Sequence, residues 1–212
     1  MRRAIAFCIA FIVLATSASA QVELSFYTGA QSAASSEVTI RESGALPDVF
    51  SQDWEGRSLQ FPLYYGLRAT SWRSERFGLG LEFAHNKIYP TSLPEDYSVL
   101  EMTDGLNTLT VNAYHRWADV IDGVNPYIGG GIGISIPHVE VETAEHTTAG
   151  YQLTGAAATW IAGATVPIND QWSVFGEYKG TYTNNTADLQ SGGTLETDVF
   201  TNAVNIGVSF NF

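Results

Sequence analysis

Residues 203–212, with the sequence AVNIGVSFNF, are the stretch that decides the fold. Every second position from Val204 to Phe212 carries a branched aliphatic or aromatic side chain, and the positions between them are small or polar. Because successive side chains of a β-strand point to opposite faces, this period of two gathers the large apolar groups on one face. The stretch therefore predicts a β-strand with one apolar face and not an amphipathic helix, whose period is 3.6 residues.

The same alternation recurs along the chain. Residues 59–69 carry Leu, Phe, Leu, Tyr, Leu and Ala at the odd positions, and residues 77–83 repeat the pattern with Gly and Glu between the apolar side chains. Strands of about ten residues cross a bilayer when they are tilted, whereas soluble strands usually have about five or six. The predicted segments are eight in number: 22–31, 58–72, 77–88, 105–117, 126–138, 151–166, 171–182 and 199–212.

The connections between these segments fall into two classes of length. The expected short turns, rich in Asn, Asp and Pro, are residues 73–76, 118–125 and 167–170. The expected long loops are residues 32–57, 89–104, 139–150 and 183–198. Long loops at one end and short turns at the other, with both termini at the short end, are typical of membrane barrels. We therefore predict an all-β fold, an eight-stranded antiparallel up-and-down transmembrane β-barrel.

A soluble lipocalin-like barrel is the alternative, because it also has eight strands behind a signal peptide. Its apolar face would line the interior, yet the lumen of eight strands is only wide enough for side chains. Here the apolar face is bulky and the other face mixes Gly with polar residues, so the bulky face is expected outside, against lipid. Aromatic residues near the segment ends are expected in two interfacial girdles: Trp72, Tyr89, Trp117, Trp160, Trp172 and Tyr182.

Residues 1–20 are predicted to be a cleaved signal peptide. Two arginines precede an apolar core over residues 4–15, and the last three residues, Ala-Ser-Ala, have the small-x-small pattern that signal peptidase reads. The one cysteine, Cys8, lies in this segment, so no disulfide framework is expected after it. We expect residues 21–212 to form one barrel in the outer membrane of a Gram-negative bacterium, with the long loops extracellular and both termini periplasmic.

Composition and charge exclude several classes of protein. With 45% hydrophobic residues the chain is not expected to be disordered, and with a net charge of -12 and no basic stripe it is not expected to bind nucleic acid. No apolar run of about eighteen residues follows the signal segment, so a transmembrane helix is not expected. Most acidic residues lie in or beside the long loops, where they either keep the loops solvated or bind divalent cations beside lipopolysaccharide phosphates.

Four charged residues are expected to face the lumen: Arg68, Glu82, Glu177 and Lys179. An isolated charge in so narrow a lumen would be very unfavourable, so these side chains must pair with one another. The pattern predicts a polar network that fills the lumen.

A second group of polar residues occupies alternate strand positions whose side chains are expected to face lipid. His85, Asn107 and His138 follow apolar outward-facing residues near the long-loop ends of neighbouring strands, with Lys87 and Glu140 one step further out. We expect a row of three at the boundary of the outer leaflet. Ionisable groups on a lipid-facing surface indicate a functional site, although simple snorkelling to the headgroups explains them equally well. A metal site through both histidines and Glu140 is a further reading of the same residues.

The residues resemble a known family. Residues 21–212 resemble the small outer-membrane β-barrel superfamily, and the final strand ending in Phe212 is similar to the assembly signal of such barrels, which implies the barrel-assembly machinery as a partner. Several blocks resemble the lipid A oxidase of rhizobial-type bacteria: YGLRAT (65–70), GLEFAHNK (80–87), TDGLN (103–107), PHVEV (137–141) and FGEYKGTY (175–182).

The resemblance implies an enzyme whose substrate and partner is lipid A, the membrane anchor of lipopolysaccharide. It would oxidise the free anomeric carbon of the proximal glucosamine to aminogluconate, with molecular oxygen as co-substrate and hydrogen peroxide as second product. His85 or His138 is then the expected base, since the anomeric hydroxyl must lose a proton. The residues expected to orient the sugar, or a divalent cation, are Lys87, Asp104, Asn107 and Glu140. The sequence itself specifies no cofactor.

Two other functions remain open. A non-catalytic small outer-membrane barrel would use its acidic surface loops to bind cations or partners. A pore is the least favoured function, because eight strands leave no open channel.

Overall fold

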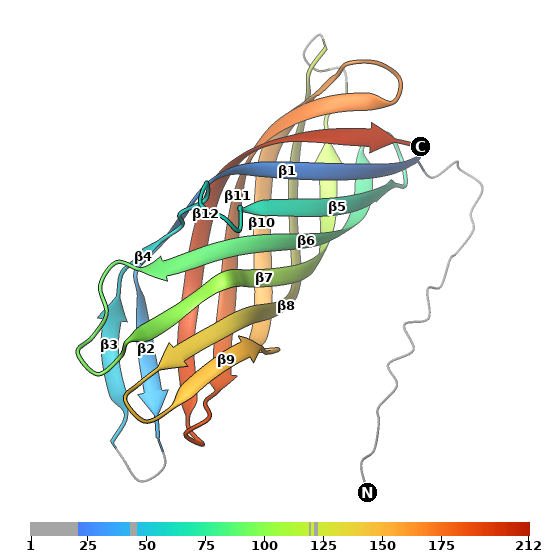
Figure 1. Cartoon of the computed structure of the whole chain (residues 1–212). Helices are drawn as coiled ribbons and strands as arrows, with labels where there is room; N and C mark the ends of the chain where they lie inside the picture. Colours follow the sequence, from blue (N-terminus) through green and yellow to red (C-terminus); the bar gives the residue numbers. More distant parts are fainter. Residues whose placement is uncertain (1–20, 43–45, 119, 121–122) are drawn as a thin grey trace, which may run out of the picture.

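The computed structural model describes residues 21–42, 46–118, 120 and 123–212, so the expected signal peptide lies outside the described residues (Figure 1). Its strands are β1 (Gln21–Ala33), β2 (Ser36–Arg41), β3 (Asp48–Gln52), β4 (Trp54–Glu55), β5 (Tyr65–Trp72), β6 (Phe77–Pro90), β7 (Val99–Arg116), β8 (Asn125–Glu142), β9 (Thr147–Tyr151), β10 (Gly155–Pro167), β11 (Trp172–Asp188) and β12 (Thr194–Asn211). Within the described ranges, no helix is long and apolar enough to cross a membrane.

Eight of these strands form a closed ring. Neighbours pair antiparallel in the order β1-β5-β6-β7-β8-β10-β11-β12, and β1 closes the ring by pairing with β12. The closing ladder runs from Glu23 opposite Asn211 to Ala33 opposite Thr201, and Figure 1 shows β12 and β1 side by side. Each ring strand pairs with the next ring strand in the sequence, so the predicted eight-stranded up-and-down barrel is confirmed.

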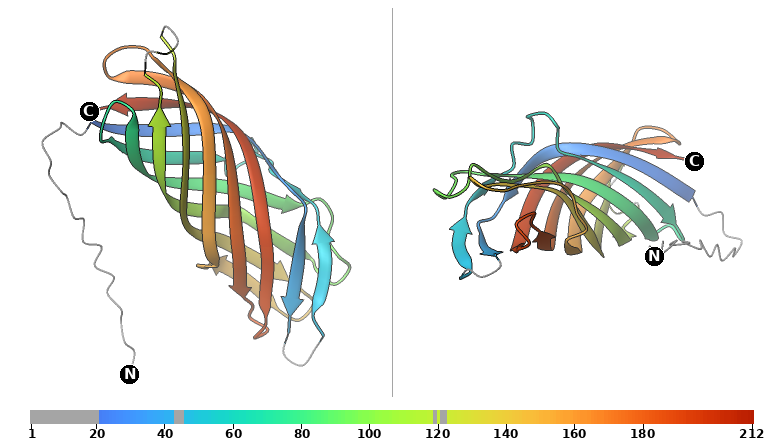
Figure 2. Two further views of the ribbon diagram at one scale, coloured as in Figure 1. Left: turned by 180° about the vertical axis from the view of Figure 1, so that it is seen from behind. Right: turned by 60° about the horizontal axis from the view of Figure 1, so that its bottom comes forward.

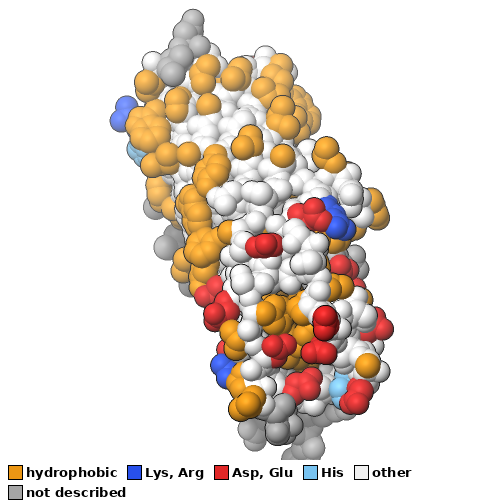
Figure 3. Space-filling model, turned by 90° about the vertical axis from the view of Figure 1, so that its left-hand side faces the viewer, with side chains coloured by type: hydrophobic (Ala, Val, Ile, Leu, Met, Phe, Trp, Pro, Cys, Tyr) orange, Lys and Arg blue, Asp and Glu red, His pale blue; other side chains and the backbone are white. Residues whose placement is uncertain are grey.

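The alternation along the strands separates lipid from lumen. On β12, Val204 and Ile206 are exposed, whereas Ala203, Asn205 and Ser209 are buried in the barrel. The other ring strands follow the same rule, which is what a period of two requires. Figure 3 shows hydrophobic side chains over the part of the wall near the short turns, while Asp and Glu side chains gather over the opposite end. The apolar face is therefore outside, as expected for a barrel in lipid.

The connections expected as long loops are built largely from strands. The prediction of a long loop over residues 183–198 is wrong. Strands β11 and β12 pair as far as Asp188 opposite Thr194, and only a five-residue turn separates the two strands. Strand β2 pairs with this extended part of β12, β3 pairs with β2, and β9 pairs with β8, so the wall continues beyond the ring (Figure 2, left).

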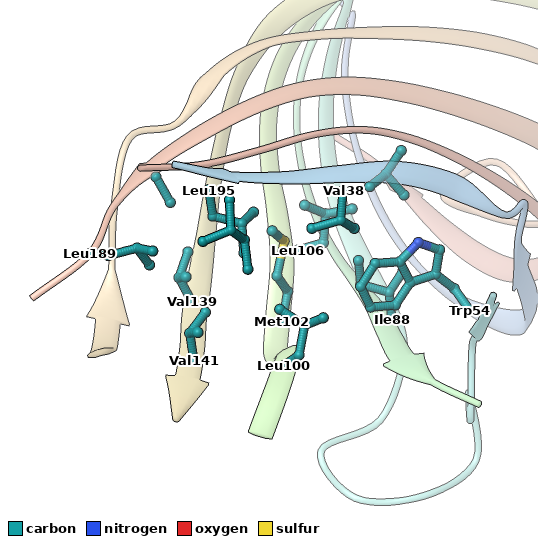
Figure 4. Packing of buried hydrophobic residues seen from close by; sticks show 13 residues of the cluster. Val38, Trp54, Ile88, Leu100, Met102, Leu106, Val139, Val141, Leu189 and Leu195 are labelled. Atoms are coloured by element: carbon teal, nitrogen blue, oxygen red, sulfur yellow. The ribbon is translucent and has the colours of Figure 1, made fainter. Parts of the chain in front are cut away.

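An apolar core fills the extended half of the barrel (Figure 4). The polar lumen of the ring thus gives way to hydrophobic packing, and both halves are occupied by side chains. The core consists of Val38, Ile40, Trp54, Ile88, Leu100, Met102, Leu106, Val139, Val141, Ala187, Leu189, Leu195 and Val199.

The predicted segment 58–72 is wrong over its first part, because β5 begins only at Tyr65. The side-chain amide of Gln31 takes the place that strand would occupy: its Nε2 donates to the carbonyl of Lys87 at 2.8 Å, and its Oε1 accepts from the amide of Lys87 at 2.9 Å. Pro62 has no N–H to give to a ladder. Residues 57–64 therefore form a loop, which we term the apolar loop because it presents exposed Leu and Phe side chains.

Trp72 corrects the expectation of two aromatic girdles. It shares the inward parity of Arg68, so its ring lies in the lumen and not at the lipid interface. Its Nε1 donates to Glu23 Oε2 at 3.3 Å, and the guanidinium of Arg116 lies 3.8 Å from the ring centroid. Trp117, with Trp160 and Trp172, is exposed on the outer wall as expected for girdle residues.

Candidate functional site

The structure brings the four charged lumen residues together. Arg68 and Glu82 are cross-strand partners on β5 and β6, with Nε donating to Oε2 at 2.6 Å. The same guanidinium donates to both carboxylate oxygens of Glu177 on β11, at 3.1 and 2.9 Å. Lys179, two residues further along β11 and also facing the lumen, donates to Glu82. Two cations thus neutralise two carboxylates inside the ring.

Buried tyrosines complete this network. Tyr27 and Tyr114 donate to the two oxygens of Glu82 at 2.9 and 3.2 Å, and Tyr127 donates to Glu177 at 2.6 Å. Each carboxylate oxygen of Glu82 therefore accepts bonds from both a cation and a phenol. Such satisfaction is what buried charges require, and it points to a structural plug and not to a reactive site.

The outward-facing pair at the far end of the ring has a different character. His85 and Asn107 are directly opposite each other on β6 and β7, and His85 Nδ1 lies 2.8 Å from Asn107 Oδ1. Tyr65 stacks on the imidazole with 5.3 Å between ring centroids. Gly105, at a φ of 113°, lies so close that a Cβ there would be 2.4 Å from His85 Nδ1. The imidazole is therefore fixed in one orientation and is only 7% exposed.

His138 does not complete the expected row. Asn107 is opposite Ile136, so His138 lies two residues further from the middle of the barrel. Its Nδ1 is 3.0 Å from Glu140 Oε1, and its ring meets that of Tyr151 edge-on at 4.8 Å. The expected row of three is therefore wrong: the polar residues form a His85–Asn107 pair and a separate His138–Glu140 pair.

The expectation that Lys87 lies at the surface, where it could bind substrate, is wrong. It has the outward parity, but the apolar loop covers it completely and its exposed fraction is 0%. Its Nζ donates to the carbonyls of Arg57 and Gln60 at 3.2 and 2.7 Å, so it fastens the loop to β6. The backbone of Asp104 belongs to β7 beside an irregularity between Glu101 and Leu106, and its side chain lies outside the described part of the structure.

The sequence matches a known family over nearly its whole length. Residues 6–212 match the family described as outer membrane protein beta-barrel domain. The chain belongs to this family. An outer-membrane location follows from that membership and agrees with the lipid-facing wall described above. A search of curated proteins gives no match to this outer-membrane barrel.

Solved structures support the fold. OprG of Pseudomonas aeruginosa is 13% identical with a TM-score of 0.57, and the alignment covers 91% of this chain and 96% of that chain. Neisserial surface protein A is 10% identical with a TM-score of 0.52 over 90% and 97% of the two chains. The protease OmpT of Escherichia coli is 9% identical with a TM-score of 0.50 over 91% and 97%. At such identities the likeness concerns the barrel alone.

The outer-membrane barrel does not gather the residues expected to bind a metal. Among the side chains that the structure describes, no three of His, Cys, Asp and Glu converge on one point. His85 and His138 belong to different pairs, and the nearest acid to His138 is Glu140 on its own strand. The reading of His85, His138 and Glu140 as one ligand set therefore lacks the required geometry.

An acidic cleft lies at the tip of the extended half of the barrel. Its volume is about 390 Å³, and Ile40 and Tyr97 contribute apolar surface. The hydroxyl of Tyr97 donates to Asp48 at 3.1 Å, and burial, followed by this bond to a carboxylate, raises the pKa of the phenol, so it stays neutral. The lining residues are Ile40, Glu42, Leu46, Asp48, Asp96, Tyr97, Thr143, Ala144, Glu145 and His146.

Sequence reasoning missed Tyr65, Tyr151 and Gly105 as neighbours of the two histidines. For the tyrosines no signal existed, because their contacts depend on pairing between distant strands. Gly105 did carry a signal: an Asp-Gly dipeptide inside an alternating run is typical of a bulge with a left-handed residue.

Proposed function

We propose that this outer-membrane barrel is an enzyme that oxidises the proximal glucosamine of lipid A in the outer leaflet, with molecular oxygen as the oxidant. The proposal includes the orientation in which the extended half of the barrel is extracellular and both termini are periplasmic. The observation that carries it is the His85–Asn107 pair, which has lipid-facing parity at the end of the ring nearest the extended half. The blocks that resemble the lipid A oxidase include both of these residues.

The proposed reaction conserves atoms and electrons. The anomeric carbon loses its C–H and O–H hydrogens and two electrons, which reduce oxygen to hydrogen peroxide and leave a lactone. Water then opens the lactone to the carboxylate of aminogluconate. The sugar gains one oxygen atom in total, and that atom comes from water.

The geometry around His85 suits a base. We propose the tautomer in which Nδ1 carries the proton and donates it to Asn107 Oδ1, which leaves Nε2 as the proton acceptor. Tyr65 and Gly105 hold the ring in place from two sides. Asn107 is thus proposed to position the base, while His138 with Glu140 offers a second proton acceptor about one step nearer the extended half.

A pore is a poor alternative for this barrel. The ring is filled by the network around Arg68, and the extended half is filled by the apolar core. Neither half leaves a continuous polar path in the described part of the chain, in keeping with the narrow lumen of eight strands.

Mass spectrometry of lipid A from cells with and without the intact gene tests the proposal. We expect the proximal sugar to gain one oxygen atom in cells that carry the intact gene and not in cells that lack it. The gain should be lost in His85→Ala, while Val204→Ala, on the lipid-facing side of β12, should keep it. Heat-dependent migration in detergent gels checks that each variant is folded. An unchanged lipid A in cells that make the substrate would overturn the proposal.

The acidic cleft supports a second candidate function. Its lining includes four acids, Glu42, Asp48, Asp96 and Glu145, which favours a cationic partner at the outer surface. A non-catalytic barrel of this kind would leave lipid A unmodified. The same mass spectra therefore separate the two functions.

A further inference from the structure

We propose that the outer wall of β11 and β12 binds the headgroup of a membrane lipid that carries an ammonium group, and that Asp198 recognises this charge. The site lies on other strands than the His85–Asn107 pair, so the inference goes beyond the proposed oxidation and does not depend on it. Along β12 from Phe210 toward the extended half, Asp198 is the first charged side chain on the lipid-facing side.

The Asp198 carboxylate is held in place by neutral donors. The hydroxyl of Tyr182 donates to its Oδ2 at 2.9 Å, and Nδ2 of Asn184 donates to its Oδ1 at 2.6 Å. Both donors belong to β11, and Asp198 itself is exposed. Each carboxylate oxygen still has a lone pair that can accept another hydrogen bond. The carboxylate is therefore oriented by the wall and open to a ligand.

The strands around this carboxylate are poor in cations. Strands β10, β11 and β12, which the structure describes throughout, carry one Lys or Arg, Lys179, and it faces the lumen. Arg41 on the neighbouring β2 pairs with Glu196. Glu37 of β2, a second exposed acid, lies beside this part of β12, because its carbonyl accepts a bond from Thr197. The local charge is negative and favours a cation from outside the chain.

Aromatic rings lie next to the carboxylate on the same wall. The ring of Phe200 is 4.7 Å from that of Tyr182 and 6.4 Å from that of Trp160, between centroids. Trp160 is opposite Gly180, and it lies so close that a Cβ there would be 2.0 Å from the indole. Ammonium groups are attracted to the faces of such rings. A carboxylate beside aromatic rings therefore suits an ammonium group on an apolar support.

The order of side chains along β12 indicates that this support is a lipid. Toward the middle of the membrane the lipid-facing side chains are Asp198, Phe200, Asn202, Val204 and Ile206. Asn202 Oδ1 accepts a bond from Tyr178 at 2.5 Å, which leaves Nδ2 to donate to an ester carbonyl. Four residues of a strand tilted by about 45° span roughly 9 Å along the membrane normal. A lipid with its ammonium group at Asp198 thus places its esters near Asn202 and its acyl chains on Val204.

Native mass spectrometry of the purified barrel in detergent micelles tests the site. The probe is phosphatidylethanolamine, and phosphatidylglycerol with the same acyl chains lacks the ammonium group. The variant is Asp198→Asn, whose amide oxygen still accepts a hydrogen bond from β11. The matched control is Glu196→Gln, which removes the same charge from the same side of β12 but from a carboxylate that pairs with Arg41.

We expect the wild type to bind phosphatidylethanolamine more tightly than phosphatidylglycerol. Asp198→Asn should bind phosphatidylethanolamine about fivefold more weakly, as the loss of one exposed ion pair implies, and Glu196→Gln should bind it as the wild type does. Phe200→Leu keeps an apolar side chain but removes the aromatic face, so it should weaken the same lipid roughly threefold. Heat-dependent migration in detergent gels checks that each variant is folded.

Four results would overturn the inference. The first is equal binding of phosphatidylethanolamine by Asp198→Asn and the wild type. The second is an equal loss in Glu196→Gln, since the net charge of the surface would then explain the binding. The third is an equal loss of phosphatidylglycerol in Asp198→Asn. The fourth is displacement of phosphatidylethanolamine by trilysine, which would assign the wall to a cationic peptide. None of these measurements uses lipid A, so the proposed oxidation is tested separately.

Discussion

Replacing Arg68 by Met tests how the ring is held together at the level of the membrane. Arg68 donates three hydrogen bonds, one to Glu82 and two to Glu177, and the side chains of both glutamates are fully buried. The methionine side chain fits the same space but carries no charge. Arg68→Met therefore leaves two buried carboxylates with Lys179 as their cation.

The expected loss of stability in Arg68→Met follows from that imbalance of charge. Removing one partner of a buried ion pair costs about 3–5 kcal/mol, because the other charge stays buried without compensation. Glu177 loses both of its bonds to Arg68 and keeps two neutral donors, the Tyr127 phenol and the Asn205 side-chain amide. The double variant Arg68→Met/Glu177→Gln removes the stranded charge, so it should be more stable than Arg68→Met alone.

Urea unfolding of the barrel in lipid vesicles, followed by tryptophan fluorescence, measures these free energies. Arg41→Met is the matched control, because its partner Glu196 and Arg41 itself are 42% and 53% exposed, and an exposed pair contributes at most about 1 kcal/mol. The reasoning would be refuted if Arg68→Met and Arg41→Met lowered the free energy of unfolding equally. It would also be refuted if the double variant were less stable than Arg68→Met.

Three further predictions concern the support of the site and the core. Gly105→Ala forces a side chain into the left-handed region and against His85. We expect the free energy of unfolding to fall by about 1–3 kcal/mol. We also expect oxidation of lipid A to fall by more than the loss of folded protein explains. Leu106→Ala should cost about 2–5 kcal/mol because the side chain is fully buried, whereas lipid-exposed Val111→Ala should cost much less. Gln31→Ala should speed amide hydrogen exchange at the edge of β6 that its side chain covers; unchanged exchange would contradict the role assigned to it.

The parity of the strands was predictable because it is local. On β12 the alternation of Val204 and Ile206 with Ala203 and Asn205 decides which face meets lipid, whatever the strand pairs with. The pairing of Arg68 with Glu82 follows in turn, since a narrow lumen forces charges of opposite sign together.

The errors arose where distant segments decide the outcome. Residues 58–64 keep the alternation, yet the side chain of Gln31 occupies the edge of β6 that they would need. Lys87 has the predicted parity, but the displaced apolar loop covers it. His138 does not lie opposite Asn107, because Ile136 occupies that position on β8. The register of the two strands depends on pairing along the whole ladder and not on local sequence.

Oxidation of purified lipid A by the purified barrel in water labelled with heavy oxygen tests the central claim most directly. We predict one hydrogen peroxide for each lipid oxidised and one heavy oxygen in the aminogluconate product. Lipid A whose anomeric hydroxyl is phosphorylated should not react, and His85→Gln should bind lipid but form no product. A folded wild-type barrel that releases no peroxide, or that treats the phosphorylated lipid equally, would contradict the account.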